Sequence, residues 1–354
     1  MITNWTEMEK QIMSVIFRRK LPIPKEIKEQ HPLKEKYHKC KAERERQIKD
    51  ILSGKDDRLL MIIGPCSADR EDAVVDYVSR LSKLQEKVKD RLLLIPRVYT
   101  NKPRTLGTGY KGMLHRPNVL GEDDMLEGLI RVRQMHIRVI EETGLTSADE
   151  ILYPDYYRYF SDLLSYAAVG ARSTENQQHR FISSGLDIPV GMKNPTGGSF
   201  EVMLNSIAAT QKQHMFMYRG YEVESEGNPF SHGILRGAVD VTGATVPNYH
   251  YEDLCRLHEM YAQKDLTNMA VVVDVNHSNS GKRWYEQDRI CRDVLGSCRC
   301  SADVRKLVKG FMVESYIEDG SQPVDGGIYG KSITDPCMGW EKTERFLYEI
   351  AELV

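Results

Sequence analysis

Four side chains that bind transition metals occur far apart in this sequence, each at or just beyond a short apolar run or in a loop. They are Cys66, His277, Glu314 and Asp335. A thiolate, an imidazole and two carboxylates form a donor set that suits a first-row divalent metal such as Mn, Fe, Co or Zn. No CxxC spacing supports the set, so Cys66 could also be a buried structural thiol, and His277 a hydrogen-bonded histidine at the core edge.

Cationic side chains follow the apolar runs in the same way. They are Arg97, Lys102, Arg104, Arg172, Lys193 and Arg236, and a further run carries Glu150. Like charges that lie together are costly unless anions neutralise them, and the guanidinium fork fits phosphate and carboxylate. The pattern therefore predicts small polyanionic ligands. A surface ion pair is the alternative for any one of these residues.

Eight apolar runs are candidates for the strands that must position these side chains. They span residues 59–64, 92–99, 149–153, 166–171, 188–193, 214–218, 270–275 and 309–315. Most are continuously apolar, as is typical of parallel strands buried on both faces, and helical patterns lie between many of them. This alternation predicts an α/β fold of the (β/α)8 TIM-barrel type, with a doubly wound sheet as the alternative. In a barrel the carboxyl ends of all strands meet at one mouth, where the polar residues would gather.

Two additions to the barrel are expected. Residues 1–50 form a charged, helix-leaning N-terminal extension, interrupted by the prolines of LPIPKEI, and we assign it to oligomerisation or regulation. Residues 51–354 then form the catalytic barrel. The run at 214–218 is taken as the sixth strand, and the apolar segment 233–238 as the return arm of an inserted β-hairpin excursion after it.

Composition excludes several classes of protein. The chain of 354 residues has 49 basic and 51 acidic side chains, so its net charge of -2 gives no reason to expect nucleic acid or an anionic membrane as a partner. The N-terminal MITNWTEMEK carries charges where a signal peptide needs an apolar core, and no run approaches the ~20 residues of a membrane span. Seven scattered cysteines argue against a disulfide scaffold. We expect a cytoplasmic protein.

Several segments resemble, in this order, the class I 3-deoxy-D-arabino-heptulosonate-7-phosphate (DAHP) synthases of the bacterial, feedback-regulated kind. They are IGPCS (63–67), RVY (97–99) with KPRT (102–105), VGARSTENQ (169–177), PVGMKNPT (189–196), ILRGA (234–238), DVNHSNS (274–280), MVES (312–315) and YGKSITDPCMGWE (329–341). The resemblance implies a metal-dependent condensation of phosphoenolpyruvate with erythrose 4-phosphate, the first step of the shikimate pathway. The sister enzymes that use arabinose 5-phosphate carry a KANR-type motif where this chain has KPRT.

The resemblance also implies roles for individual residues. It makes Cys66, His277, Glu314 and Asp335 the metal ligands, and Lys102, Cys66 and His277 the catalytic residues. Phosphoenolpyruvate would be held by Arg97, Lys111, Arg172, Lys193 and Arg236, with backbone contacts from Gly170 and Ala171. Erythrose 4-phosphate would be held by Lys102, Arg104 and Thr105. Glu150 would help to place water and lysine near the reacting carbon.

One segment departs from the family pattern. After Thr105 the chain reads LGTGYKG, one residue longer and richer in glycine than usual, and Lys111 lies in this altered segment. Lys102 is the candidate proton donor to the aldehyde oxygen, since a lysine among cations can have its pKa lowered.

Other functions and partners stay open. The alternatives are the arabinose 5-phosphate enzyme, a Schiff-base aldolase using Lys193, and a non-catalytic phosphosugar-binding regulator. The resemblance further implies a homo-oligomer, dimer or tetramer, and an aromatic amino acid as a possible feedback inhibitor.

Overall fold

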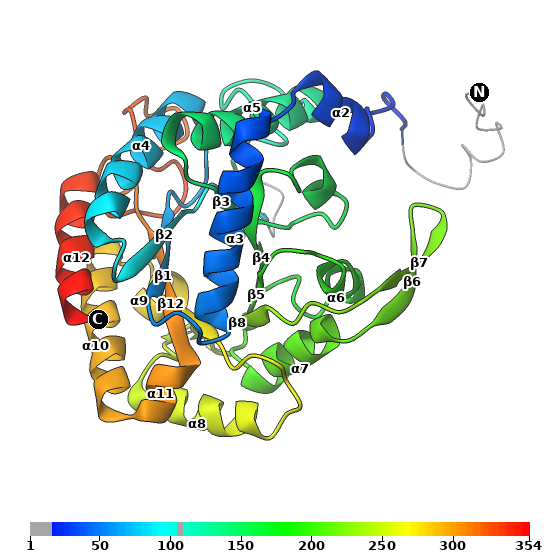
Figure 1. The fold of residues 1–354 in the computed structure, drawn as a ribbon. Coiled ribbons are helices and arrows are strands. Elements are labelled where there is room, and N and C mark those ends of the chain that lie inside the picture. Colours follow the sequence, from blue (N-terminus) through cyan, green and yellow to red (C-terminus); the bar gives the residue numbers. More distant parts are fainter. Residues whose placement is uncertain (1–15, 105–108) are drawn as a thin grey trace.

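The computed structural model of the chain describes residues 16–104 and 109–354, and its centre is a ring of eight parallel strands surrounded by helices (Figure 1). The strands are β1 (Leu59–Gly64), β2 (Leu92–Pro96), β3 (Ser147–Glu150), β4 (Leu164–Val169), β5 (Val190–Lys193), β8 (Ser231–Leu235), β11 (Val271–Asp274) and β12 (Val308–Glu314). Their order is β2-β1-β12-β11-β8-β5-β4-β3. A parallel bridge between Arg97 and Ala148 joins the two ends of this sheet. The predicted TIM barrel is therefore confirmed.

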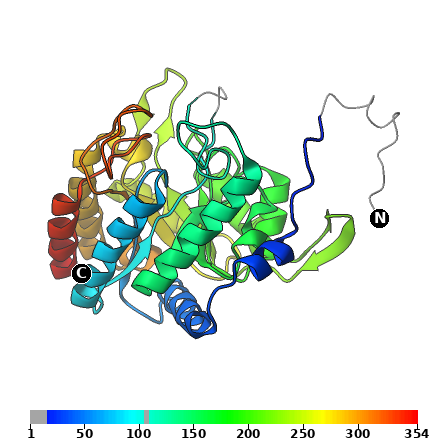
Figure 2. The same cartoon turned by 90° about the horizontal axis from the view of Figure 1, so that it is seen from above.

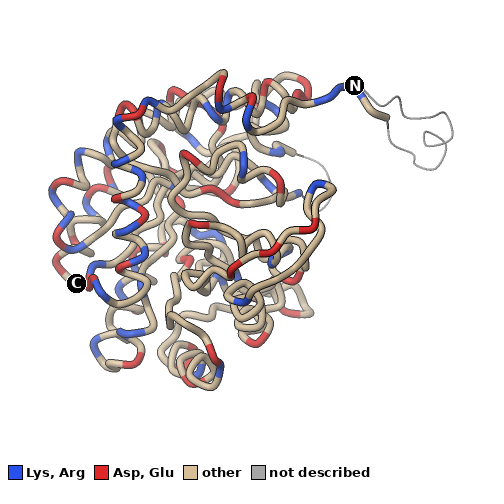
Figure 3. Tube along the Cα trace, turned by 45° about the vertical axis from the view of Figure 1, so that its right-hand side comes forward, with Lys and Arg blue, Asp and Glu red and all other residues tan. Residues whose placement is uncertain are grey.

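The outer layer consists of the helices that follow the strands along the chain. They are α4 (Glu71–Val88), α5 (Met125–Thr143), α6 (Gln177–Ser184), α7 (Phe200–Gln211), α8 (Tyr251–Ala262), α10 (Gln287–Cys300), α11 (Ala302–Leu307) and α12 (Trp340–Leu353). Local sequence sets their ends: Asp124 accepts hydrogen bonds from the first turn of α5, and Gly144 closes that helix in the left-handed conformation. Lys, Arg, Asp and Glu are interspersed along these outer helices (Figure 3). In the described part of the chain, no helix combines the length and apolar character needed to cross a bilayer.

The segment before β1 closes the amino-terminal end of the barrel. It contains α2 (Pro24–Gln30), a 3-10 turn η1 (Glu35–Tyr37) and α3 (His38–Leu52). Helix α3 crosses the end of the ring opposite the long loops (Figures 1 and 2). Its buried residues Ile48, Ile51 and Leu52 pack with the side chains inside the barrel. Helix α3 thus runs through the expected boundary at residue 50, and its last turns belong physically to the barrel.

The prediction for the sixth strand is wrong. Residues His214–Tyr218 form β6, which pairs with β7 (Tyr221–Ser225) in an antiparallel hairpin outside the barrel (Figure 1). The sixth barrel strand is β8, so the hairpin precedes that strand and does not follow it. A second, very short pair, β9 (Ala238–Val239) and β10 (Thr245–Val246), follows β8 at the mouth. The burial of β6 alternates along the strand, as in a half-exposed hairpin, whereas β8 is buried throughout.

Candidate active site

A polar cavity of about 370 Å³ lies at the carboxyl ends of the strands. The expected site residues that line it are Arg97, Lys102, Arg104, Glu150, Gly170, Ala171, Arg172, Lys193, Arg236, His277 and Asp335. They come from the ends of β2, β3, β4, β5, β8 and β11 and from the loops that follow the strands. The barrel therefore brings together eleven side chains and backbone positions that lie up to 238 residues apart in sequence (97 to 335).

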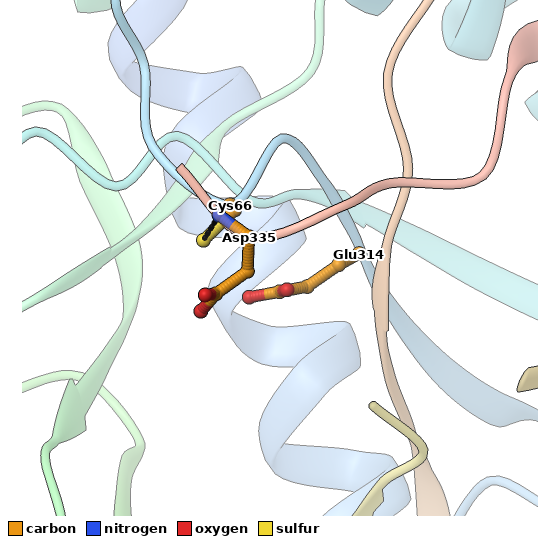
Figure 4. Close-up of side chains that lie close together, drawn as sticks. All are labelled: Cys66, Glu314 and Asp335. Carbon is orange, nitrogen blue, oxygen red and sulfur yellow. Dashed lines mark hydrogen bonds between the residues drawn. The ribbon is translucent and has the colours of Figure 1, made fainter. Parts of the chain in front are cut away.

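Cys66, Glu314 and Asp335 form one corner of this mouth. Each offers a ligand atom, and the three atoms lie within 4.8 Å of one another. Figure 4 shows the side chains converging from the loop after β1, the end of β12 and the loop before α12. The backbone N–H of Asp335 donates a hydrogen bond to Cys66 Sγ at 3.3 Å, which ties the two loops together.

His277 lies next to this corner but outside the three-residue group. Its Nε2 is 3.9 Å from Glu314 Oε1, and its Nδ1 is 2.7 Å from Asp274 Oδ2. His277 begins the one-turn helix α9 (His277–Ser280) with a positive φ of 38°, a strained backbone conformation for a histidine. The sharp turn after β11 directs the ring back toward Glu314.

The donor set fits a divalent metal. Glu314 Oε1 is buried and, among the described residues, receives no hydrogen bond, although Arg97 Nη2 lies 3.0 Å away as an ion-pair partner. A buried carboxylate oxygen without a hydrogen bond is costly unless a cation completes its surroundings. Arg97 and His277 hold the pKa of Glu314 below its usual range even though burial alone would raise it. The carboxylate is therefore charged and available as a ligand.

Lys102 reaches into the same corner. Its Nζ donates a hydrogen bond to Cys66 Sγ at 2.6 Å and lies 3.4 Å from Asp335 Oδ2. Burial alone would lower the pKa of Lys102, but the neighbouring Cys66 and Asp335 more than offset this effect and raise it above its usual range. The expected lowering of this pKa is therefore wrong, because the nearest groups are acidic. Burial raises the pKa of the Cys66 thiol to about 11.

Other cations line the same cavity. Lys193 Nζ lies 3.6 Å from Asp274 Oδ2 and 3.9 Å from Glu150 Oε2. Burial lowers the pKa of Arg236, and its Nη1 has no hydrogen-bond partner within residues 16–104 and 109–354. Gly170 allows a close approach of backbone to side chain, because a Cβ there would lie 2.5 Å from Glu150 Oε1. Protein groups neutralise the charge of these cations only in part, and an anionic ligand would complete the neutralisation.

Among the described residues, Lys111 is the one expected site residue that belongs neither to the cavity lining nor to the corner of Cys66, Glu314 and Asp335. Lys111 forms an ion pair with Asp123 at 2.8 Å and is absent from the lining. Thr105 lies outside the described residues.

Three other side chains of the site were not singled out from the sequence. Asp274 contacts both Lys193 and His277, Lys282 pairs with Asp335 at 2.8 Å, and the ring of Tyr99 lies 3.8 Å from the Arg97 guanidinium. Asp274 stands in DVNH, three residues before His277, and this spacing was the available signal.

Comparison with known proteins assigns the class. Residues 29–348 match the model of the DAHP synthetase I family, which is nearly the whole chain. The chain therefore belongs to the DAHP synthetase I family.

Two named relatives and one solved structure show how far the likeness extends. A Trp-sensitive phospho-2-dehydro-3-deoxyheptonate aldolase of Escherichia coli O6:H1 is 37% identical over 317 residues, which cover 87% of this chain and 88% of the relative. The Phe-sensitive enzyme of Escherichia coli K12 is 37% identical over 339 residues, or 94% and 93% of the two chains. The structure of such an aldolase from Francisella tularensis SCHU S4 superposes with a TM-score of 0.89 at 28% identity, covering 96% of this chain and 98% of the other.

Proposed function

We propose that this chain condenses phosphoenolpyruvate with D-erythrose 4-phosphate and water to give DAHP and phosphate, the first step of the shikimate pathway. The observation that carries the proposal is a single cavity that seven lysine and arginine residues line, the six expected ones and Lys282, beside a corner of one thiol and two carboxylates. Family membership supports the same reaction. The cations suit two phosphorylated anions, and the corner suits one divalent metal.

Four residues would hold the metal: Cys66, His277, Glu314 and Asp335. A bound Mn, Fe, Co or Zn ion would polarise the aldehyde of the sugar as a Lewis acid. Asp274 contacts His277 Nδ1 at 2.7 Å, so it would fix the orientation of this ligand ring.

Phosphoenolpyruvate would bind at Arg97, Arg172, Lys193 and Arg236, with its phosphate against the backbone of Gly170 and Ala171. Arg97 is almost fully buried, at 1% exposure, and is held in place by Glu314 at 3.0 Å. A buried and prepositioned guanidinium loses little freedom when the anion binds. Lys111 joins this group only if it leaves Asp123, which makes it the weakest member of the set.

Erythrose 4-phosphate would bind at Lys102, Arg104 and Thr105. The raised pKa of Lys102 keeps its ammonium protonated, so it can orient the aldehyde oxygen and donate a proton to it as the new bond forms. Glu150, near Lys193, would place the water that adds to the other substrate.

Bond formation then follows from the positions of the substrates. C3 of phosphoenolpyruvate attacks the aldehyde carbon, water adds at C2, and the resulting hemiketal phosphate releases inorganic phosphate by C–O cleavage. The cations offset the repulsion between the two phosphates and hold both carbons in one orientation. Such orientation is worth up to roughly 7–11 kcal/mol in favourable systems.

Phosphate release with different sugars tests the proposal. Purified protein with Mn²⁺ and phosphoenolpyruvate should release phosphate with erythrose 4-phosphate and far less with arabinose 5-phosphate. EDTA should abolish the release, and Mn²⁺ or Co²⁺ should restore it. Preference for arabinose 5-phosphate would favour the sister enzyme. A borohydride-trapped adduct on Lys193 without inhibition by EDTA would favour the Schiff-base aldolase, and no turnover with any sugar would favour a binding protein.

The two substrate subsites can be separated by paired variants. Arg104→Ala should raise the KM for erythrose 4-phosphate about tenfold or more and change the KM for phosphoenolpyruvate little. Arg172→Ala should do the reverse, since a charge-assisted hydrogen bond contributes about 1.5–3 kcal/mol. Initial rates at varied concentrations of each substrate give both constants. Equal effects of both variants on both constants would contradict the assignment of the subsites.

We also propose that an aromatic amino acid inhibits the chain by binding in a cavity beside the N-terminal extension. Two relatives are Trp- or Phe-sensitive by name. A cavity of about 320 Å³ lies between residues 21–23 of the N-terminal extension and three tyrosines, Tyr153, Tyr156 and Tyr159. Asp155 and Arg219 also line it and lie 3.7 Å apart. The Asp155 carboxylate could bind the ammonium group of an amino acid, and the Arg219 guanidinium its carboxylate.

Deletion of residues 1–23 tests this regulatory proposal. The deletion spares α3, so the barrel stays closed, and inhibition by phenylalanine, tyrosine or tryptophan should weaken while turnover persists. Unchanged inhibition would place the effector elsewhere. A homo-oligomer, assembled partly through the N-terminal extension, and a cytoplasmic location stay predictions.

A further inference from the structure

Asp149 is a buried acidic residue that the proposed reaction does not use. It lies on β3 between Ala148, which faces the barrel interior, and Glu150, which lines the cavity. Asp149 is 1% exposed. Neighbouring side chains of a strand point to opposite faces, so Asp149 points into the layer between the sheet and its helices. That layer is otherwise mainly apolar, and a buried carboxylate there is costly unless it is fully hydrogen-bonded.

Four donors satisfy the Asp149 carboxylate. Oδ1 accepts the backbone N–H of Thr100 at 2.9 Å and that of Glu150 at 2.7 Å. Oδ2 accepts the hydroxyl of Tyr156 at 3.0 Å and also that of Thr100. Asp149 on β3 therefore binds both the backbone and the side chain of Thr100, which lies in the loop after β2. Hydrogen bonds to a charged acceptor are about twice as strong as neutral ones.

A histidine completes this buried cluster. His136 on α5 is fully buried, and its Nε2 lies 3.8 Å from Asp149 Oδ2. Its ring packs against Phe160 with centroids 6.0 Å apart. Thr100, His136, Asp149 and Tyr156 thus place four polar groups where this layer of a barrel normally holds apolar side chains.

Thr100 is the base of the segment that carries Lys102 and Arg104. Its N–H is bound by Asp149, and its carbonyl accepts the N–H of Leu114 at 3.3 Å. Two residues later, the N–H of Lys102 donates to the carbonyl of Lys111 at 3.0 Å. Two residues of chain span at most ~7 Å, so the position of Thr100 limits where the backbone of Lys102 can lie.

We infer that Asp149 is a positioning residue that fixes the Lys102–Arg104 segment over the metal-binding corner. The Asp149 carboxylate holds Thr100 by hydrogen bonds to its N–H and its hydroxyl. It also binds the N–H of Glu150, which fixes the end of β3 relative to this segment. Because Lys102 and Arg104 belong to the sugar side of the cavity, loss of the anchor should affect that substrate selectively. This last step rests on the proposed function, whereas the anchoring of Thr100 does not.

Two measurements on the full-length protein test the inference. The first is amide hydrogen exchange of peptides covering Tyr99–Lys102 without substrates; Asp149→Ala should speed exchange there at least tenfold. The second is the pair of Michaelis constants. The KM for erythrose 4-phosphate should rise about tenfold, and that for phosphoenolpyruvate less than twofold. Asp149→Asn should lie between wild type and Asp149→Ala, since an amide oxygen can still accept both backbone N–H groups.

Milder variants and a control keep the test decisive. Tyr156→Phe and Thr100→Val each remove one hydroxyl and should give smaller changes in the same direction if Asp149→Ala does not fold. Gln85→Ala is the matched control. Gln85 on α4 is also buried and also binds backbone groups: it accepts a hydrogen bond from the N–H of Leu94 at 2.7 Å and donates one to the carbonyl of Leu92 at 2.9 Å. Both partners lie on β2, before the chain reaches the mouth of the barrel. Its loss should lower stability without changing either KM.

The outcomes separate the two proposals. A wild-type protein that releases no phosphate from the two substrates overturns the proposed function, and hydrogen exchange still decides the anchor. An active wild type whose Asp149 and Tyr156 variants keep both Michaelis constants and the exchange rate overturns the anchor. Equal rises in both constants, matched by Gln85→Ala, would likewise reduce Asp149 to a structural role.

Discussion

The two ends of the barrel are built from the same strands but have opposite chemistry. At the base, Ile48, Ile51 and Leu52 of α3 pack with interior residues such as Leu60 and Leu93, and all five are almost completely buried. At the mouth, the buried groups include Arg97, Glu314, Asp274 and Cys66. Three of them, Arg97, Glu314 and Asp274, each keep an atom that has no hydrogen-bond partner among the described residues.

This difference separates stability from function. Apolar burial stabilises a fold by roughly 25 cal/mol per Å². Buried charges with incomplete partners cost free energy until a ligand or metal binds. We therefore expect substitutions at the base to change stability with little effect on turnover, and substitutions at the mouth to do the opposite.

The largest effect should come from the metal-binding corner. Asp335→Asn should lower turnover about a thousandfold or more, equivalent to ~4 kcal/mol, because a carboxylate ligand becomes a neutral amide. The melting temperature of the metal-free protein should change little, since Asp335 is partly exposed, its partner Lys282 is exposed, and Lys102 keeps its hydrogen bond to Cys66. Titration with Co²⁺, followed by absorption, should show weakened binding. A variant that binds Co²⁺ as tightly as wild type would remove Asp335 from the ligand set.

The base should give the converse result. Ile51→Ala should lower the free energy of unfolding by about 3–4 kcal/mol, because it leaves a cavity where α3 closes the barrel. Turnover per folded molecule should stay within about twofold of wild type. Urea unfolding and initial rates on the same preparation measure both quantities. A large loss of turnover with unchanged stability would contradict the hypothesis that the base of the barrel determines stability and the mouth determines function.

The smallest effect concerns a titratable group inside the barrel. Burial lowers the pKa of His232 to about 4, and its two ring nitrogens contact the Tyr166 hydroxyl at 2.8 Å and the Phe230 carbonyl at 2.9 Å. The unfolded chain takes up a proton on this histidine near pH 6.5, whereas the folded protein does so only near pH 4. Between these values the unfolded state binds more protons, so falling pH destabilises the fold by up to about 3 kcal/mol.

Replacing the histidine should remove this contribution. His232→Gln should flatten the decline of the unfolding free energy between pH 6.5 and 4, relative to wild type. His38→Gln, at an exposed position on α3, is the control and should leave the decline unchanged. If His232→Gln declines as steeply as wild type, another group causes the acid sensitivity.

Much of this architecture could be predicted because parallel barrel strands are buried on both faces. Seven of the eight expected strands lie in the barrel, displaced by at most a few residues. The exception is instructive: HMFMY at 214–218 is more apolar than SHGIL at 231–235, yet only the second is a barrel strand. His232 is accommodated inside the barrel because Tyr166 binds it. On the opposite face of β8 only a glycine fits at position 233, because a Cβ there would lie 3.0 Å from the Met203 side chain of α7. Neither partner is visible in local sequence.

For the site, residue types and their places at strand ends were enough to predict a cationic cavity beside a thiol and carboxylates. The order of the strands and the chemistry of Cys66, Glu314 and Asp335 are properties of the sequence itself. Tertiary structure alone decided that acidic neighbours raise the pKa of Lys102, that Lys111 pairs with Asp123 outside the cavity, and that Asp149 binds Thr100. The reason is physical: pKa values and hydrogen-bond partners depend on groups a few ångströms away in space, and the closed barrel places those groups together from distant parts of the chain.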